Sequence, residues 1–370
     1  MTSLFADDEL KNASPELLPP QENSYLLGLE AAEKSLFDAF HSGRMHHAWL
    51  IAGPEGVGKS TLAYRFARYI LNASQSTPGD GLYMLPNHPV FRRIAVGGHT
   101  DLIVVKRSLN EKGKLRKEIV VDDVRRIAPF FSKTAGEGGW RVVIVDGVDN
   151  ANQNAANALL KVLEEPPKQT ILLLVCHNPG KLLPTIRSRC RRLDVRALEI
   201  DTMETVLGFY APDLAASELK QLIPLAEGRI GRALDLIDHG GLELYNNLSD
   251  LLKTLPSMDL MALESFTAKV AKAKNADDLG RDGFSQFQEL FCGWLQQLIL
   301  LSSGAENIVL PRLNQGQFNE INRLVSLTTL DRLLQLWDKV TALLARTDRV
   351  NLDRKQVITS IFLSLQETLS

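Results

Sequence analysis

Cysteine is scarce in this chain of 370 residues, which contains only Cys176, Cys190 and Cys292. The three are odd in number, far apart in the sequence and without C-x-x-C spacing. This pattern predicts neither a disulfide framework nor a cysteine-rich zinc site. Apolar runs long enough to span a membrane are also missing, and the first residues lack the basic-then-apolar pattern of a signal peptide. We therefore expect a cytoplasmic protein with no zinc site and no membrane partner.

The chain also lacks an excess of charge of either sign. Lys and Arg number 42 and Asp and Glu number 44, which gives a net charge of −2. This balance argues against a protein that coats nucleic acid, although a local basic face remains possible. With 45% hydrophobic and 23% charged residues, the composition is typical of a globular protein. The length suggests two or three domains, each able to bury its own core.

One complete phosphate-binding motif is present. Residues 53–60, GPEGVGKS, satisfy G-x-x-x-x-G-K-[ST]. The apolar run from Trp49 to Ala52 predicts a buried strand before the motif, and apolar residues at helical spacing from Thr61 to Leu71 predict a helix after it. This strand–loop–helix order favours a nucleotide site over the alternative, a chance glycine-rich loop.

Each residue type in the motif has a physical role in binding a nucleotide. Glycines let backbone N–H groups and the positive end of the next helix converge on phosphate oxygens. Lys59 can reach the β- and γ-phosphates, and Ser60 can offer a hydroxyl to Mg²⁺. The candidate residues for ATP and Mg²⁺ are Gly53, Pro54, Glu55, Gly56, Val57, Gly58, Lys59, Ser60 and Thr61, with Asp146 for Mg²⁺ and Asn178.

Further apolar runs predict a parallel sheet whose strands alternate with helices. Strands are expected over Asp101–Val105, Arg141–Asp146, Ile171–Val175 and Cys190–Val195, and helices over Leu29–Phe40, Val120–Phe131 and Asn152–Glu164. This alternation implies an α/β fold with helices on both faces of the sheet. Asp146 ends its strand where a P-loop fold keeps the acid that holds Mg²⁺. Asn72–His99, rich in Ser, Pro, Gly and Asn, is expected to be an irregular insertion.

Beyond about Ala197 the pattern is helical. Helices are predicted over Thr202–Tyr210, Ala215–Ala226, Gly231–Ile237, Phe284–Leu301 and Leu330–Arg346, followed by a last helix that Asn351-Leu352-Asp353 caps. None of them carries a catalytic constellation. We interpret these helices as packing and assembly surface.

Two clusters leave alternatives open. His41, His46 and His47 precede the phosphate loop, but no carboxylate or cysteine completes a metal site, so a structural role is favoured. The segment Lys106–Lys117 carries six basic residues against Glu111. It is either a solvated loop or a surface that approaches phosphate backbones.

Two further segments carry a resemblance to a known family. Residues 154–167, NAANALLKVLEEPP, are similar to the signature helix of clamp-loader ATPase subunits of the AAA+ class. Residues 183–190, LPTIRSRC, resemble the Ser-Arg-Cys motif of the same subunits. Together with the phosphate loop and the helix start at Asn351-Leu352-Asp353-Arg354, the similarity covers nearly the whole chain.

The resemblance implies a P-loop AAA+ domain over 24–196, a small helical lid over 197–241 and an all-helical collar for oligomerisation over 242–370, after a flexible lead-in over 1–23. It also implies a ring with gamma or tau and delta subunits of DNA polymerase III, which loads a sliding clamp onto primed DNA. Arg189 would be the arginine finger that reaches the nucleotide of the adjacent motor subunit. The alternative is that Arg187, Arg189, Arg191 and Arg192 form a basic surface turn.

The chain departs from the hydrolysing members of this family. Asp146 is followed by Gly147, where those members carry the Glu that polarises the attacking water, and the next acid is Asp149. In the lid, the position of their arginine corresponds to Gly231, with Arg232 one step further. Motor subunits also bind zinc through four cysteines after the first helix, and the insertion here contains none.

These departures predict a chain that binds ATP, does not hydrolyse it and contributes Arg189 in trans. The alternatives are a hydrolysing motor subunit of the same ring, similar to gamma or tau, or an unrelated P-loop enzyme. A third class, a non-enzymatic scaffold that binds nucleic acid, depends on Lys106–Lys117 alone.

Overall fold

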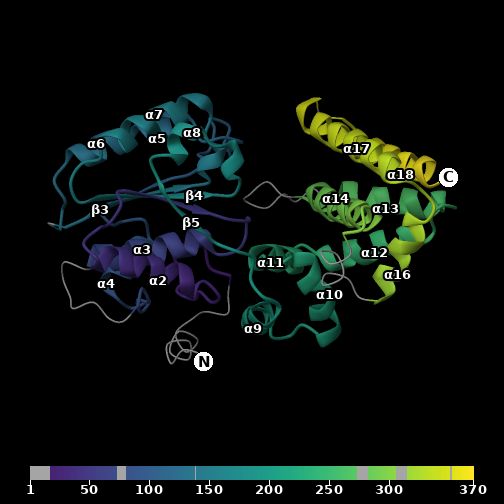
Figure 1. Cartoon of the computed structure of the whole chain (residues 1–370), viewed down its shortest axis with the longest axis horizontal. Helices are drawn as coiled ribbons and strands as arrows, with labels where there is room; N and C mark the ends of the chain where they lie inside the picture. The colour runs from purple at the N-terminus through teal and green to yellow at the C-terminus, as the bar shows by residue number, and fades with distance from the viewer. Residues whose placement is uncertain (1–16, 73–80, 138, 273–281, 306–314, 351) are drawn as a thin grey trace. The chain divides into compact units, whose positions relative to one another are not determined.

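The computed structural model describes residues 17–72, 81–137, 139–272, 282–305, 315–350 and 352–370. The chain divides into two compact units (Figure 1). The first unit contains the residues up to Leu214 together with Gly228–Leu234, and the second contains Ala215–Glu227 and Asp235–Ser370. The chain therefore passes between the two units three times.

A five-stranded parallel sheet forms the centre of the first unit, in the order β2-β3-β4-β1-β5. Its strands are β1 (Ala48–Ala52), β2 (Leu102–Val105), β3 (Arg141–Asp146), β4 (Thr170–Cys176) and β5 (Arg191–Asp194). Every residue of β1 and β4 is buried, as expected for inner strands that helices cover on both faces. The register pairs Ala52 with Cys176 and Asp146 with Val175, so β1, β3 and β4 end at the same edge of the sheet.

Helices cover both faces of this sheet, which confirms the predicted fold class. In Figure 1, α2, α3 and α4 lie on one face, and α5, α6, α7 and α8 lie on the other. The helices of this unit are α2 (Glu30–His41), α3 (Lys59–Asn72), α4 (Pro89–Ala95), α5 (Val121–Arg125), α6 (Ile127–Ser132), α7 (Gln153–Glu164), α8 (Pro184–Arg187) and α9 (Ile200–Tyr210), with 3₁₀ turns η1 (Val148–Asn150) and η2 (Pro179–Lys181).

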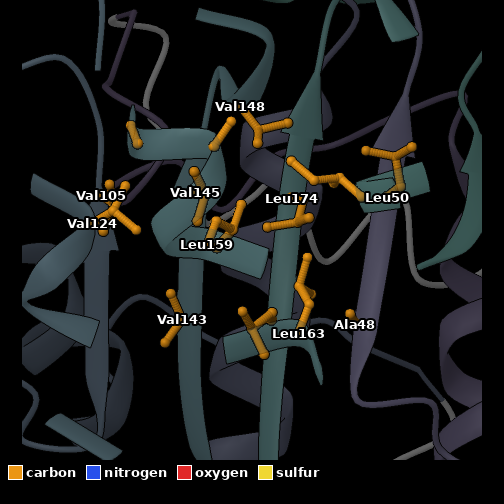
Figure 2. Packing of buried hydrophobic residues seen from close by; sticks show 14 of the residues in the cluster. Ala48, Leu50, Val105, Val124, Val143, Val145, Val148, Leu159, Leu163 and Leu174 are labelled. Carbon is orange, nitrogen blue, oxygen red and sulfur yellow. The ribbon is translucent and has the colours of Figure 1, made fainter. Parts of the chain in front are cut away.

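A hydrophobic core holds α7 against the sheet. The side chain of Asn152 caps the helix by accepting a hydrogen bond from the N–H of Ala155 at 2.9 Å. Figure 2 shows Leu159 and Leu163 of α7 among the side chains of β3 and β4, and both are almost fully buried. Burying a leucine contributes about 1.5–3 kcal/mol. Both ends of α7 are consequently held at defined positions along the sheet.

The predicted helix over Val120–Phe131 is wrong in one respect, because it is two short helices, α5 and α6, that break at Arg126. Pro129 lies three residues beyond the break. It has no N–H to donate to the carbonyl of Arg125, so a continuous helix would lose that hydrogen bond.

The insertion predicted to be irregular over Asn72–His99 contains the helix α4, which the sequence analysis missed. A proline at the first helical position, Pro89, starts it, and the Nδ1 atom of His88 accepts a hydrogen bond from the N–H of Val90 at 3.2 Å. Residues 73–80 of this insertion lie outside the described residues.

The end of the predicted lead-in over 1–23 is anchored to α3. Residues 1–16 lie outside the described part of the chain. Arg68, almost fully buried, donates hydrogen bonds to the carbonyls of Gln21 at 2.6 Å and Asn23 at 3.1 Å, and its guanidinium lies 3.9 Å from the ring centre of Phe91. Burial lowers the pKa of Arg68 to about 9. Through Arg68, α3 thus fixes the chain segment that precedes α2.

The second unit consists of helices around an aromatic core. Phe287 and Phe291 of α14 pack against Phe362 of α18, with ring centroids 6.3 and 5.6 Å away. Asp353 caps α18 by accepting a hydrogen bond from the N–H of Gln356 at 3.0 Å, whereas Asn351 lies outside the described residues. The helices are α10 (Ala216–Ala226), α12 (Gly241–Lys253), α13 (Leu260–Lys272), α14 (Gly283–Ser302), α16 (Gln315–Val325), α17 (Leu330–Val350) and α18 (Arg354–Leu369).

The segment predicted as a lid, 197–241, contributes to both units. Helix α9 belongs to the first unit and α10 to the second, and α11 (Ile230–Asp238) starts in the first and ends in the second. The boundaries of lid and collar stay predictions. Over the described ranges, no helix combines the length and apolar character needed to cross a membrane.

Candidate nucleotide site

The phosphate loop joins β1 to α3 at the edge where the strands end. Gly56 and Gly58 have positive φ angles of 82° and 95°, which side chains other than glycine rarely adopt. Lys59, only 2% exposed, donates a hydrogen bond from its amine to the carbonyl of Pro54 within the same loop. The loop therefore folds around the lysine that begins α3, two residues earlier than the predicted helix start at Thr61.

A second segment of the chain contacts this loop backbone to backbone. The N–H of Gly231 donates a hydrogen bond to the carbonyl of Gly56 at 2.8 Å. A Cβ atom added at Gly231 would lie 3.0 Å from the Cα of Gly56, so only glycine permits this approach without a shift. Gly231 stands where the hydrolysing relatives are expected to carry an arginine, and Arg232, the next residue, is buried.

The strand-end acid, Asp146, contacts the phosphate loop. The hydroxyl of Ser60 donates a hydrogen bond to Oδ1 of Asp146 at 2.8 Å, although the two residues are 86 positions apart. The pairing of β3 with β4 and of β4 with β1 brings them together. A hydroxyl and a carboxylate oxygen are the hard donors that Mg²⁺ takes, so the residues present fit this ion.

The residues after Asp146 are arranged differently from a water-activating site. Gly147 has a φ of 77°, and a Cβ atom there would lie 3.0 Å from Nδ2 of Asn150. Both carboxylate oxygens of Asp149 accept backbone hydrogen bonds, from the N–H of His177 at 2.9 Å and from that of Asn178 at 3.0 Å. Asp149 thus holds the turn that follows β4.

Asn178, predicted to bind nucleotide, caps that same turn. Its Oδ1 atom accepts a hydrogen bond from the N–H of Gly180 at 3.1 Å, at the start of η2. The strand before this turn adjoins the phosphate loop, because the N–H of Gly53 donates a hydrogen bond to the carbonyl of Cys176 at 3.2 Å. Asn178 lies two residues beyond Cys176, and its side-chain oxygen is directed to its own turn.

Arg189 lies toward the other end of the sheet. It is two residues before Arg191, which pairs with Trp49 near the start of β1, whereas the phosphate loop follows Ala52 at the end of that strand. Its Nη2 atom lies 3.0 Å from Oε1 of Glu164, the last residue of α7. The structure thus separates Arg189 from the phosphate loop of its own chain.

The neighbouring arginines have partners inside the chain. Arg192 pairs with Asp194 at 2.7 Å, and the guanidinium of Arg191 lies 4.8 Å from the ring centre of Trp49. Arg191 and Arg192 thus contact groups of β1 and β5, whereas Arg189 contacts α7.

The three cysteines are free thiols, and Cys176 is buried. Burial raises the pKa of Cys176 to about 12, of Cys190 to about 12 and of Cys292 to about 11. Within the ranges that the structure describes, no group of three or more His, Cys, Asp or Glu side chains could hold a metal ion. The lack of a zinc site stays a prediction for the chain as a whole.

The histidines near the loop make structural contacts. Nδ1 of His41 lies 2.9 Å from the carbonyl of Phe37, and its Nε2 lies 3.1 Å from the hydroxyl of Tyr69. Nδ1 of His46 lies 2.8 Å from the carbonyl of Ala48. These bonds support the structural role favoured from the sequence.

The basic segment Lys106–Lys117 forms an ordered turn, which we call the basic hairpin. Leu109 and Leu115 form an antiparallel bridge, and Oδ1 of Asn110 accepts hydrogen bonds from the N–H groups of Lys112 at 2.9 Å and Lys114 at 3.0 Å. Its lysines, Lys106, Lys112, Lys114 and Lys117, are exposed. The segment is therefore a preformed cationic projection of the first unit.

Two contacts fix the base of the basic hairpin. The hydroxyl of Ser108 donates to Oδ2 of Asp123 at 3.2 Å, and the N–H of Ile119 donates to the carbonyl of Asn150 at 2.9 Å. Asn150 in turn donates its N–H to the carbonyl of Gly147 at 2.8 Å. Two hydrogen bonds thus connect Ile119, two residues beyond the hairpin, to Gly147, the residue after the strand-end acid.

The fold and the site define an α/β protein with a P-loop between its first strand and the following helix. A family profile described as "DNA polymerase III, delta subunit" matches residues 28–199. The DNA polymerase III subunit delta′ of Pseudomonas aeruginosa is 37% identical over 186 residues, which cover 49% of this chain and 53% of that protein. The subunit delta′ of Yersinia pestis is 31% identical over 251 residues, covering 62% of this chain and 69% of that protein.

The chain belongs to the family of delta-prime clamp-loader subunits of DNA polymerase III. It spans about half the length of the Pseudomonas relative. Among solved structures, a gamma subunit-related DNA polymerase III protein of Thermotoga maritima aligns with 93% of this chain and all of its own, at a TM-score of 0.44 and 19% identity.

Two features of the site were not visible in the sequence. The contact between Gly56 and Gly231 joins segments 175 positions apart. In the sequence, its only sign is a glycine at a position where an arginine is expected. The pair of Glu164 and Arg189 also joins two motifs that we treated separately. Both depend on tertiary packing, which brings distant motifs together.

We predict that nucleotide affinity falls as the pH rises above about 8. Burial lowers the pKa of Lys59 to about 8, while Glu55, Asp146 and Asp149 oppose this shift. Bound phosphates favour the charged amine and raise this pKa, so binding is strongest below pH 8 and weakens as the pH rises through the pKa of the free protein. Calorimetry at pH 8.5 in two buffers should detect uptake of roughly 0.5–0.8 proton per nucleotide.

The control for this prediction is Lys59→Ala, which should bind nucleotide weakly and take up no proton in this range. An affinity for wild-type protein that stays constant from pH 7 to pH 9.5 would contradict the assignment of Lys59 to the phosphates.

Proposed function

We propose that this chain is a clamp-loader subunit that binds ATP with Mg²⁺ at its own site, does not hydrolyse it, and contributes Arg189 to the nucleotide of a neighbouring subunit. The observation that carries the proposal is the arrangement after Asp146. The phosphate loop and the Mg²⁺-type oxygens are intact, but the position of the water-activating Glu is a glycine with a left-handed backbone.

The binding half of the proposal rests on the loop from Gly53 to Thr61. Its backbone N–H groups and the N-terminus of α3 suit the phosphates, and Lys59 supplies a positive charge from a buried position. Ser60 and Asp146 supply oxygens for Mg²⁺, which when bound neutralises charge on the phosphates. Asn178 follows the adjacent strand end, and its side chain caps its own turn.

The absence of hydrolysis rests on Gly147 and Asp149. A glutamate at position 147 would need a φ of 77° and would bring its Cβ within 3.0 Å of Asn150, so the local backbone disfavours the catalytic side chain itself. Asp149 uses both oxygens for the turn after β4. Losing a general base typically lowers a rate by about 10²- to 10⁴-fold.

The role of Arg189 in trans is supported by its position, because the length of α7 separates Arg189 from the nucleotide site of its own chain. Asp146 precedes the N-terminal end of this helix by seven positions, and Glu164, the partner of Arg189, is its last residue. Twelve helical residues extend about 18 Å. A guanidinium suits the role because its planar fork stays charged and can bond two phosphate oxygens at once.

The assembly that follows from this role is a ring with gamma or tau and delta subunits, which loads a sliding clamp onto primed DNA in the cytoplasm. The name shared by the relatives, DNA polymerase III subunit delta′, supports this setting. A hydrolysing motor subunit remains the alternative, and Gly147 and Gly231 argue against it.

We predict that Arg189→Ala leaves ring assembly intact and lowers ATP turnover and clamp loading in the ring reconstituted with primed DNA and clamp. A finger supplied in trans contributes about 10³- to 10⁵-fold in single-site systems. The loss in a ring should be smaller, about 10-fold or less, because other interfaces carry their own fingers. Steady-state ATPase and clamp-loading assays give the measurement.

The matched controls are Arg187→Ala and Arg191→Ala, which should change turnover little. Unchanged turnover for Arg189→Ala, together with a clear loss for either control, would show that the finger has been assigned to the wrong arginine.

DNA as a partner is supported by the basic hairpin. Its six basic residues against one acid stand out in a chain of net charge −2, so the rest of the chain is net acidic. The hydrogen bonds of Asn110 order the turn before any partner binds. Cations spaced along a preformed turn can contact the phosphate backbone of DNA. Such contacts do not depend on the DNA sequence.

We predict that replacing Lys106, Lys112, Lys114 and Lys117 together by Gln weakens primed-DNA binding by the ring. Each lost phosphate contact should reduce the slope of log affinity against log salt by about 0.9. A salt titration by fluorescence anisotropy measures this slope. The charge-matched control replaces Lys34, Lys133, Lys168 and Lys220, all exposed, and an equal loss in both variants would refute a specific role for the hairpin.

A further inference from the structure

The Arg189 side chain is held by two contacts on the surface of its own chain. Nη2 lies 3.0 Å from Oε1 of Glu164, and Nη1 donates a hydrogen bond to the carbonyl of Thr185 at 3.0 Å. These bonds use two of the five N–H donors of a guanidinium. Arg189 is 36% exposed and Glu164 is 50% exposed, so water and a docking partner can reach the pair.

Both partners of this ion pair stand on well-anchored backbone. Leu163, next to Glu164, is 2% exposed, and Ile186, three residues before Arg189, is fully buried in the same core. The N–H of Arg189 donates to the carbonyl of Ile186 at 3.1 Å. The backbone from which the two side chains extend is thus fixed by the core.

Neither helix stability nor fold stability accounts for Glu164. It is the last residue of α7, where a carboxylate meets the negative end of the helix dipole, which is unfavourable for the helix. Exposed ion pairs also contribute little to the stability of a fold. The pair therefore matters chiefly for what it does to the orientation of Arg189.

We infer that Glu164 is a positioning residue for the arginine finger. The carboxylate and the Thr185 carbonyl hold the guanidinium in one orientation before a neighbouring subunit docks, so less side-chain freedom is lost when it meets a phosphate. The fixed fork allows the guanidinium to keep its carboxylate partner on one side while donating to phosphate oxygens with its remaining N–H groups. This inference rests on the proposed role of Arg189 in trans.

The test compares four variants in the reconstituted ring with primed DNA and clamp. They are Glu164→Gln, Glu165→Gln, Arg189→Ala and the double variant of Glu164→Gln with Arg189→Ala. Glu165 is the matched control because it is the adjacent, equally charged and exposed residue. Thermal unfolding of each purified chain shows whether the fold has been kept.

Glu164→Gln is expected to lower kcat for ATP turnover by about 3- to 10-fold, in the range of measured couplings between contacting residues, with little change in KM. Glu165→Gln should match wild-type protein. In the Arg189→Ala background, Glu164→Gln should cause no further loss, because its effect passes through the finger. A merely structural role would lower turnover in that background too.

The outcomes separate this inference from the proposed function. If Arg189→Ala lowers turnover while Glu164→Gln behaves like Glu165→Gln, the positioning role is wrong and the finger stands. A rise in turnover for Glu164→Gln would mean that the pair restrains the finger, which also overturns the inference. If Arg189→Ala has no effect, the finger assignment fails and the positioning role fails with it.

Discussion

The 2.8 Å hydrogen bond from Ser60 to Asp146 is the contact on which the nucleotide site depends. It exists because β1 and β3 flank β4 in a parallel sheet and end at one edge. Buried strands and α7 hold this register, since a one-residue slip would turn buried side chains of a strand to its other face. The same edge receives the contact of Gly231 with Gly56, so two distant segments, around Asp146 and Gly231, converge on the phosphate loop.

The sheet also separates two kinds of chemistry within the first unit. The oxygens and the lysine suited to a nucleotide lie where the strands end, whereas Arg189 lies beside the far end of α7. Because α7 lies between them, the chain can present a nucleotide site near one end of this helix and the Arg189 guanidinium near the other. Under the proposed function, Gly147 and Asp149 leave this site without a water-activating carboxylate, whereas the oxygens of Ser60 and Asp146 stay in contact.

Local patterns were enough to predict the sheet and the phosphate loop from the sequence, because buried parallel strands are continuous apolar runs. The bounds of β3 match the prediction residue for residue, and its last residue, Asp146, lies where a magnesium acid was expected. The break at Arg126 was missed because Pro129 lies inside an otherwise helical pattern. The pair of Glu164 and Arg189 could not be predicted, since it depends on how α7 and α8 pack.

ATP turnover by the chain itself decides whether this subunit binds ATP without hydrolysing it. The measurement uses the purified chain, alone and in a ring whose other subunits carry alanine at their phosphate-loop lysines. The account predicts saturable nucleotide binding and no turnover above background in either sample. Turnover of about 1 s⁻¹ or more, typical of working enzymes, and its loss in Lys59→Ala would contradict the account.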